Sequence, residues 1–433
     1  MGKRVQRIEY GAKGGIAYPF FMVSIFLSLL MACGSIQAAN TVSGTLDKLH
    51  DNPKAGLLWR DANGKDLQNI RADRAFIPAS TTKLVTALMA LDHWGEDYRF
   101  KTEFYLLEHE DAAPDLLIKG YGDPFLVSEE LVLMAEALAT SLRERGIRRL
   151  QRLLLDDSYY GPEAVLPGTG ETSNPYDAVP SALAANFNSI YIRRNSKQWV
   201  SAEPQTPLTA LSEQVARQQW RLHPFKGAER FNLGTKPKTG SRYFGELFSL
   251  FLQQKGIQLE QESRVSGIDA GQHLDDLLVT YRNSHTLGEV IRSMLAYSTN
   301  FIANQLALNL AADTLGVPAD SEKVARFYTR WLKERFHWVD YRLEDGAGLS
   351  KENHLTPQQL LDVLNAFLPW RYLLPEIEPG IYAKTGTLKG VSCLAGYIVR
   401  KGEWQPFALM VNSPVAYLFR IQVAQALQAV QKE

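Results

Sequence analysis

The sequence predicts an α+β fold in which both ends of the chain contribute strands to one antiparallel sheet. Three observations predict it. Strand-like runs occur near the start and at the end of the chain, a helical region lies between them, and the middle carries short strand-like runs among Gly, Pro and Asn turns. With 433 residues, the chain is long enough for one large domain with insertions or for two to three ordinary domains.

The first forty residues have the pattern of an export signal. Basic residues precede an apolar run from Phe20 to Ala32, and the small residues Ala38 and Ala39 follow it. The run is shorter than the roughly 20 apolar residues that span a bilayer. We therefore expect residues 1–39 to be a signal segment that is cleaved near Ala38. The alternatives are an uncleaved anchor and a lipoprotein acylated at Cys33.

The early mature chain predicts a β-hairpin that leads into a helix. An Asn-Gly turn separates two strand-like runs, and Pro78 then interrupts the second run. Apolar residues recur at helical spacing after this proline, until Gly95. The expected elements are a strand over residues 55–60, a return strand within 67–76 and a helix that opens near Ser80.

In the middle of the chain, residues 101–279, short strand-like runs alternate with turns rich in Gly, Pro and Asn. This pattern predicts one or two inserted α+β subdomains. Residues 40–100 and 280–433 would then form a single domain, from which this insertion protrudes. Within the insertion we expect strands over 102–107 and 152–155 and a helix over 129–145.

The last third of the chain predicts helices and then a closing set of strands. Apolar residues recur at helical spacing in four segments, and alternation returns after residue 380. The expected helices cover residues 287–297, 301–315, 321–336 and 357–367, and the expected strands cover 380–387, 391–400 and 406–412, before a final helix over 415–431.

The composition excludes several classes of function. The net charge is zero, with 47 basic and 47 acidic residues, so nothing indicates a nucleic-acid partner. The eight histidines form no H-E-x-x-H pair, so no metal site is expected. Cys33 and Cys393 are the only cysteines, and we expect no internal disulfide once the signal is removed or Cys33 is acylated.

Three short motifs carry the candidate chemistry. The first is S-x-x-K at Ser80 and Lys83, which places an amine one helical turn after a hydroxyl. The second is S-x-N at Ser298 and Asn300, in a polar break between two helical runs. The third is K-T-G before an apolar strand, comprising Lys384, Thr385 and Gly386, with Thr387 next to it. Each motif alone has an ordinary explanation, such as a capping serine or an edge strand with a turn.

Together, and in this order, the motifs resemble those of the penicillin-recognising serine acyltransferases, which include β-lactamases and penicillin-binding proteins. The segment Asp345–Ser350 and the long insertion after the first motif resemble one branch, the class C D-alanyl-D-alanine carboxypeptidase/endopeptidases. This resemblance implies a β-lactamase/transpeptidase-like catalytic domain, with an antiparallel sheet and helices, that carries the insertion. A second K-T-G, Lys238–Gly240, lies in a polar stretch before Ser298 and is rejected as the third motif.

The resemblance also implies roles for the motif residues. Ser80 would attack the peptide carbonyl, Lys83 would act as base beside Lys384, and Ser298 would relay the proton to the leaving D-alanine. Asn300 would bind the substrate amide. The terminal carboxylate would be held by Lys384, Thr385 and Thr387, while Gly386 admits the substrate backbone closely. The backbone N–H groups of Ser80 and Thr387 would form the oxyanion hole.

The implied protein is an exported serine-type carboxypeptidase, periplasmic or bound to the cell envelope. It needs no cofactor, acts on peptidoglycan stem peptides and is acylated by β-lactam antibiotics. It contacts a membrane only if Cys33 is lipidated. Three alternatives share the scaffold: a β-lactamase, a non-catalytic peptidoglycan-binding protein and an esterase. The class A E-x-x-L-N pattern and the G-x-S-x-G elbow are both absent. The sequence leaves open the balance of carboxypeptidase and endopeptidase activity, the preferred stem peptide and the oligomeric state.

Overall fold

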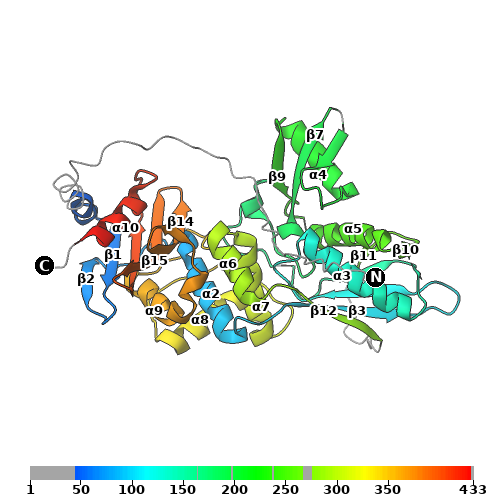
Figure 1. The fold of residues 1–433 in the computed structure, drawn as a ribbon, viewed down its shortest axis with the longest axis horizontal. Helices are drawn as coiled ribbons and strands as arrows, with labels where there is room; N and C mark the ends of the chain where they lie inside the picture. Colours follow the sequence, from blue (N-terminus) through cyan, green and yellow to red (C-terminus); the bar gives the residue numbers. More distant parts are fainter. Residues whose placement is uncertain (1–43, 163, 197, 237, 267–275, 431–433) are drawn as a thin grey trace, which may run out of the picture. The chain divides into compact units, whose positions relative to one another are not determined.

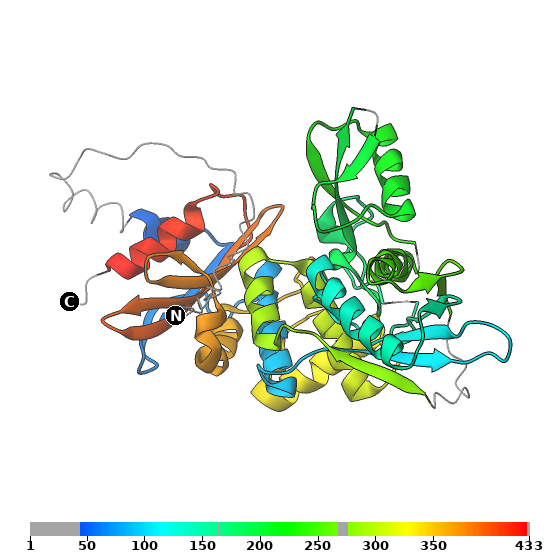
Figure 2. The same cartoon turned by 45° about the vertical axis from the view of Figure 1, so that its right-hand side comes forward.

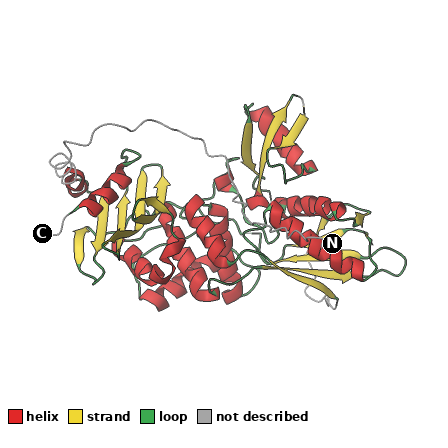
Figure 3. Ribbon diagram, in the orientation of Figure 1, coloured by secondary structure: helices red, strands yellow, loops and turns green. Residues whose placement is uncertain are grey.

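The structure is a computed structural model, and it describes residues 44–430 except 163, 197, 237 and 267–275. The expected signal segment, with Cys33, lies outside the described residues. Figure 1 shows the described elements in chain order, Figure 2 turns them by 45° and Figure 3 separates helices from strands.

A six-stranded antiparallel sheet joins the two ends of the chain, as the sequence predicts. Its order is β13-β14-β15-β16-β1-β2. The N-terminal hairpin meets the C-terminal strands at the β1–β16 pair, where Leu57 lies opposite Leu409. The strands are β1 (Ala55–Arg60), β2 (Asp66–Ile70), β13 (Glu376–Glu378), β14 (Ile381–Leu388), β15 (Val391–Arg400) and β16 (Glu403–Val411).

Both faces of this sheet are buried, and the alternation of side chains along β16 shows how. Phe407 and Leu409 belong to a core shared with helix α10 (Phe419–Ala429). Ala408 and Met410 point the other way and pack with the helical layer. Because successive side chains of a strand face opposite sides, an all-apolar strand fits only between two covering layers. Figures 1 and 3 show these layers flanking the sheet.

Two helices of the helical layer are buried almost all round, which is expected only for helices at the centre of a core. Every residue of α2 from Thr82 to Leu91 is buried, and so is α7 from Phe301 to Ala312. The layer consists of α2 (Thr82–Trp94), α6 (Leu287–Tyr297), α7 (Asn300–Leu315), α8 (Ser321–Phe336) and α9 (Pro357–Phe367). These bounds agree with the predicted helices to within two residues.

The middle of the chain forms its own sheets and its own apolar core. The largest sheet has the order β11-β6-β4-β3-β12, and α3 and α5 contribute to the same core. A three-stranded sheet, β8-β7-β9, and a parallel pair, β10-β5, complete the region. Its elements are β3 (Lys101–Leu107), β4 (Asp115–Gly120), α3 (Ser128–Glu144), β5 (Arg149–Leu150), β6 (Leu153–Asp156), β7 (Ser189–Asn195), β8 (Gln198–Ser201), α4 (Ala210–Leu222), β9 (Ala228–Asn232), α5 (Thr239–Gln254), β10 (Gln258–Leu259), β11 (Arg264–Val265) and β12 (Leu277–Arg282).

We propose that this region is an insertion into the domain built by the two ends of the chain. Strand β3 starts at Lys101, where the insertion was expected to begin. Strand β12 pairs with β3 and runs to Arg282, three residues beyond the expected end at 279. Since β3 and β12 are adjacent, the insertion leaves and re-enters the main domain at neighbouring positions, as an inserted domain must.

Two elements at the C-terminal end differ from their predicted bounds. Strand β16 begins at Glu403 instead of 406, because the Lys401-Gly402 turn sets its pairing with β15 from Arg400 onward. Pro406 is tolerated inside the strand, since the pairing of β16 with β1 ends at the next residue, Phe407. Helix α10 begins at Phe419, later than the predicted 415.

The packing predicts which substitution unfolds the main domain. Phe407 is fully buried in the sheet core. We expect Phe407→Ala to lower the free energy of unfolding by about 3 to 5 kcal/mol, through lost burial and the cavity left behind. Val339, which is 94% exposed, provides the control, because Val339→Ala should change stability by less than about 0.5 kcal/mol. Equal urea midpoints for the two variants would contradict the assignment of Phe407 to the core.

Candidate active site

Ser80 lies in a 3₁₀ turn, Ala79–Thr81, directly before helix α2. The sequence predicts that a helix opens near Ser80. In the structure α2 begins at Thr82, and Ser80 lies in the 3₁₀ turn just before it. Ala79 has a left-handed φ of 48°, and the Thr81 hydroxyl donates to the Pro78 carbonyl at 2.7 Å, which closes the turn. Ser80 is half-buried, whereas Lys83 in the first turn of α2 is fully buried. In the Ser80–Lys83 pair, the hydroxyl therefore lies nearer the surface and the amine lies in the interior.

The Lys83 amine lies within hydrogen-bonding distance of three oxygen atoms, one from the preceding turn and two from distant parts of the chain. It lies 3.0 Å from Ser80 Oγ, 2.8 Å from Asn300 Oδ1 and 2.9 Å from the Ala347 carbonyl oxygen. The structure thus brings the first and second motifs into direct contact. The third acceptor is a backbone carbonyl, which no motif of side chains could have revealed.

These three contacts determine how a neutral Lys83 must be oriented. The oxygens of Asn300 and Ala347 can only accept hydrogen bonds. A neutral amine has two N–H groups and one lone pair, so both N–H groups serve these two oxygens. The lone pair is then left for the third neighbour, the Ser80 hydroxyl, which can donate its proton. This is the arrangement that a general base requires.

The surroundings of Lys83 favour its neutral form. Burial lowers the pKa of Lys83 well below its usual value, and the nearby charge of Lys384 lowers it further, while Asp345 opposes this shift. Burial also lowers the pKa of Lys384, to about 7, and the charge of Arg420 adds to that shift. Among the described residues, neither lysine forms an ion pair with a carboxylate within 4.0 Å.

Asp345 shapes the loop that presents the Ala347 carbonyl to Lys83. Its buried carboxylate accepts hydrogen bonds from the backbone N–H groups of Ala347, Leu349 and Ser350, and from the Asn353 side chain at 2.6 Å. Next to it, Gly348 has φ +79°, and a Cβ there would lie 1.9 Å from the Ala79 carbonyl oxygen. The glycine thus allows the loop to pack directly on the 3₁₀ turn of Ser80.

The second motif forms the junction between α6 and α7. Ser298 ends α6 in the left-handed conformation, with φ 57° and ψ 38°, and Asn300 is the first residue of α7. Besides accepting from Lys83, Asn300 donates through Nδ2 to the Tyr176 carbonyl at 3.1 Å. Tyr176 belongs to the middle region, so that region reaches the site. In the described part of the chain, no hydrogen bond joins Ser298 to Ser80 or Lys83.

The third motif lies on β14 and passes close to the nucleophile. A Cβ on Gly386 would lie 2.8 Å from the Pro78 carbonyl oxygen and 3.2 Å from the Ser80 nitrogen, so only glycine fits without displacement. Strand β13 pairs with β14 only at its start, through Tyr382 and Ile381. From Lys384 to Leu388, no described strand pairs with that edge of β14. The edge is open for an extended substrate backbone.

Arg420, on α10, reaches the third motif, and sequence reasoning missed it. Its Nη1 donates to the Gly386 carbonyl oxygen at 2.9 Å and to Thr387 Oγ1 at 2.6 Å. It stands 33 positions after Thr387, in a helix whose surface carries no motif.

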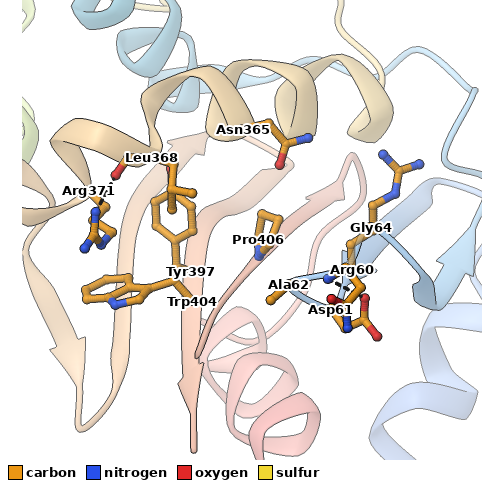
Figure 4. A pocket seen from close by; sticks show the side chains of 11 residues that line it. Arg60, Asp61, Ala62, Gly64, Asn365, Leu368, Arg371, Tyr397, Trp404 and Pro406 are labelled. Carbon is orange, nitrogen blue, oxygen red and sulfur yellow. Dashed lines mark hydrogen bonds between the residues drawn. The ribbon is translucent and has the colours of Figure 1, made fainter. Parts of the chain in front are cut away.

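Two other features of the chain do not belong to this site. The second K-T-G lies at the start of α5, where Lys238 precedes the helix in a left-handed conformation, so it forms no strand. A cavity of about 570 Å³ lies between the end of α9 and the sheet, and Figure 4 shows Trp404, Tyr397 and Arg371 lining it. None of the motif residues lines this cavity. The described residues contain no cluster of three or more His, Cys, Asp or Glu side chains able to hold a metal ion.

A half-exposed serine, a buried lysine with a depressed pKa and an open strand edge define a class of protein, the serine acyl-transfer enzymes of the β-lactamase/transpeptidase fold. The comparisons with known proteins agree. Residues 42–370 match the D-Ala-D-Ala carboxypeptidase 3 (S13) family. The chain therefore belongs to this family and is a serine-type D-Ala-D-Ala carboxypeptidase.

The relatives and solved structures have low sequence identity but cover nearly the whole chain. A D-alanyl-D-alanine carboxypeptidase of Actinomadura sp. (strain R39) is 24% identical over 94% of this chain and 91% of its own length. The D-alanyl-D-alanine carboxypeptidase DacB of Haemophilus influenzae is 22% identical over 86% of this chain and 88% of its own length. The crystal structure of penicillin-binding protein 4 from H. influenzae superposes with a TM-score of 0.69 at 20% identity, covering 89% of this chain and 97% of that one. This likeness confirms the predicted fold.

The cation pair predicts a pH effect. In Lys384→Ala a positive neighbour of Lys83 is lost, so the pKa of Lys83 rises, because its protonated form is no longer repelled. The low-pH limb of the kcat/KM profile should move to higher pH, and kcat/KM on a D-Ala-D-Ala peptide should fall roughly 10- to 100-fold. Lys384→Arg keeps a cation and should keep the limb nearer its wild-type position.

Lys389, an exposed lysine in the turn after β14, supplies the matched control. Lys389→Ala should leave both the limb and kcat/KM within about twofold of wild type, since an exposed charge is screened by solvent. If Lys384→Ala also matches wild type, the third motif is wrongly assigned to Lys384.

Proposed function

We propose that Ser80 is the nucleophile and Lys83 the general base of this carboxypeptidase. The observation that carries the proposal is the pair of acceptor oxygens at the Lys83 amine, from Asn300 and Ala347, which leaves its lone pair to the Ser80 hydroxyl. Neutral Lys83 takes the hydroxyl proton as Ser80 Oγ attacks the carbonyl between the two D-alanines. The C–N bond then breaks, D-alanine leaves, and water hydrolyses the acyl-enzyme.

The edge of β14 supports the choice of substrate. An extended peptide can lie along this open edge, with its carbonyl near the Ser80 nitrogen that faces Gly386. The backbone N–H groups of Ser80 and Thr387 would form the oxyanion hole, where each donor is typically worth about 3 kcal/mol. Lys384, Thr385 and Thr387 would hold the terminal carboxylate that every D-Ala-D-Ala peptide carries.

The second motif supplies the proton path and a substrate contact in this proposal. Ser298, at the turn before α7, would pass the proton to the departing amine. Asn300 already accepts a hydrogen bond from Lys83 and donates one to the Tyr176 carbonyl. Its side-chain amide has a second N–H and a second lone pair, so we propose that it orients Lys83 and also binds the substrate amide.

Penicillins fit the same chemistry, because a β-lactam presents an acylating carbonyl and a carboxylate. One solved structure of H. influenzae penicillin-binding protein 4, at 20% identity and a TM-score of 0.65, is a complex with a β-lactam. A predatory endopeptidase of Bdellovibrio bacteriovorus has a TM-score of 0.50 at 16% identity. We propose that β-lactams acylate Ser80, and that cross-linked stem peptides are a second class of substrate.

The nucleophile assignment is tested by labelling. Wild-type protein treated with a fluorescent penicillin should gain one adduct, located by peptide mass mapping on the peptide that contains Ser80. Ser80→Ala removes the attacking oxygen and should give no adduct. Since it removes only one half-exposed hydroxyl, it should keep the unfolding midpoint of wild type.

Ser249 in α5 provides a matched control, because its hydroxyl only donates to the Gly245 carbonyl of its own helix. Ser249→Ala should be labelled like wild type. Equal labelling of wild type and Ser80→Ala would place the nucleophile elsewhere. Product analysis with purified muropeptides, scoring free D-alanine against resolved dimers, measures the two peptidase activities.

We propose that the protein is exported and acts in the periplasm or at the cell envelope, because its substrate lies there. In the part of the chain that the structure describes, none of the helices is both long and apolar enough to cross a bilayer. Export rests on the pattern of residues 1–39.

The route of export is tested by intact-mass spectrometry of protein from its native host. A mature start near Asn40 is expected from simple cleavage, because the small residues Ala38 and Ala39 fit a signal-peptidase site. A lipid-modified start at Cys33 would instead identify a lipoprotein. A Met1 start in the cytosolic fraction would overturn the export proposal.

A further inference from the structure

Arg420 is a buried cation with no anionic partner. It is only 7% exposed, and in the described part of the chain it forms no ion pair with Asp or Glu. Its Nε is buried and has no hydrogen-bond partner. Leaving a charge and a donor of this kind unpaired in the interior is costly, so its presence needs an explanation.

The two hydrogen bonds of Arg420 lie in the proposed carboxylate site, and its guanidinium also lies over the exposed Tyr417 ring, 5.7 Å from the ring centroid. Nη1 donates to the Gly386 carbonyl oxygen and to the Thr387 hydroxyl oxygen. A guanidinium cannot accept a hydrogen bond, so the Thr387 oxygen must be the acceptor in this contact. The single O–H proton of Thr387 is then directed away from Arg420. Thr387 is exposed, so this proton is available to a ligand at the edge of β14.

A hydroxyl fixed as a donor requires an acceptor opposite it. Both oxygens of a carboxylate accept hydrogen bonds, and the group carries the negative charge that Arg420 and Lys384 lack nearby, whereas a primary amide is neutral and has one accepting oxygen. Arg420 therefore fixes the direction of the Thr387 O–H proton and places a positive charge beside it. Among the described residues, no Asp or Glu side chain forms an ion pair with Arg420 within 4.0 Å.

We propose that Arg420 is a positioning residue that orients the Thr387 hydroxyl as a donor and makes this site select a free terminal carboxylate. The inference rests on the proposed function, since it assigns the substrate carboxylate to the edge of β14. It adds a residue from the C-terminal helix, outside the three motifs. Arg420 acts through Thr387 and the local charge.

The test compares a peptide acid with its amide. The substrates are N-acetyl-L-lysyl-D-alanyl-D-alanine and the same peptide amidated at its C-terminus. Arg420→Met keeps much of the side-chain volume but removes the charge and the donors. It should lower kcat/KM on the acid about 10- to 100-fold, mainly by raising KM, because the contact is made in both the ground and transition states. On the amide the change should stay within about threefold.

Two further variants separate positioning from loss of structure. Arg420→Lys keeps the positive charge and should restore part of the preference for the acid. Thr387→Val removes the hydroxyl without a large change of shape and should reproduce the loss on the acid. Because Arg420 acts through this hydroxyl, the double variant should lose much less than the product of the two single losses.

Arg400 provides the matched control, because it also anchors α10. Its Nη2 donates to the Val430 carbonyl at the other end of this helix. Arg400→Met should weaken the packing of α10 and should change activity on acid and amide alike. If Arg420→Met lowers kcat/KM by the same factor on both substrates, as is expected of Arg400→Met, the positioning role is overturned.

The outcomes distinguish this inference from the proposed function. Turnover of the acid by wild type, with equal losses on both substrates in Arg420→Met, defeats the Arg420 inference alone. Absence of turnover of both peptides by wild type defeats the proposed function and the inference together. Additive losses of Arg420→Met and Thr387→Val would show that the two residues act separately, which also overturns the inference.

Discussion

The structure of the site depends on one buried amine. Lys83 contacts a serine hydroxyl, a side-chain amide oxygen and a backbone carbonyl, and it forms no ion pair with a carboxylate of the described residues. Burial and a neighbouring cation lower the pKa of Lys83 well below its usual value, which favours the neutral amine that a general base needs. The surrounding elements hold these acceptors in place: Asp345 orders the loop of Ala347, and the α6–α7 junction presents Asn300.

Among the described residues, Lys83, Lys384 and Arg420 form no ion pair with a carboxylate, which is unusual for buried cations, and we propose that this serves two ends. Lys384 lowers the pKa of Lys83 and lies on β14, the strand to which Arg420 donates. A peptide that ends in a carboxylate would be attracted to this edge and would bring the missing negative charge with it. The positive charge of Lys384 would thus both lower the pKa of Lys83 and attract the substrate carboxylate. A substitution that removes this charge would affect the base and the binding of substrate together.

Much of the fold was predictable because the relevant signals are local. Helices α8 and α9 begin with capping residues and repeat apolar side chains at helical spacing, and β15 lies between turn residues. Ser80, Lys83 and Lys384 were found because their motifs are contiguous. Arg420 and the Ala347 carbonyl were missed, since their contacts join distant segments and one of them involves only backbone. The altered start of β16 shows that a two-residue turn outweighs a proline inside the strand.

The order of the chain has a consequence for its synthesis. The Ser80–Lys83 pair is made early, but its partners follow at Asn300 and Ala347, and β14 with Arg420 comes last. A nascent chain would therefore carry the proposed nucleophile long before it possesses the proposed base held in position or a strand to receive a peptide. On this proposal, an incomplete polypeptide lacks the arrangement needed for acylation until β14 and α10 have joined the sheet.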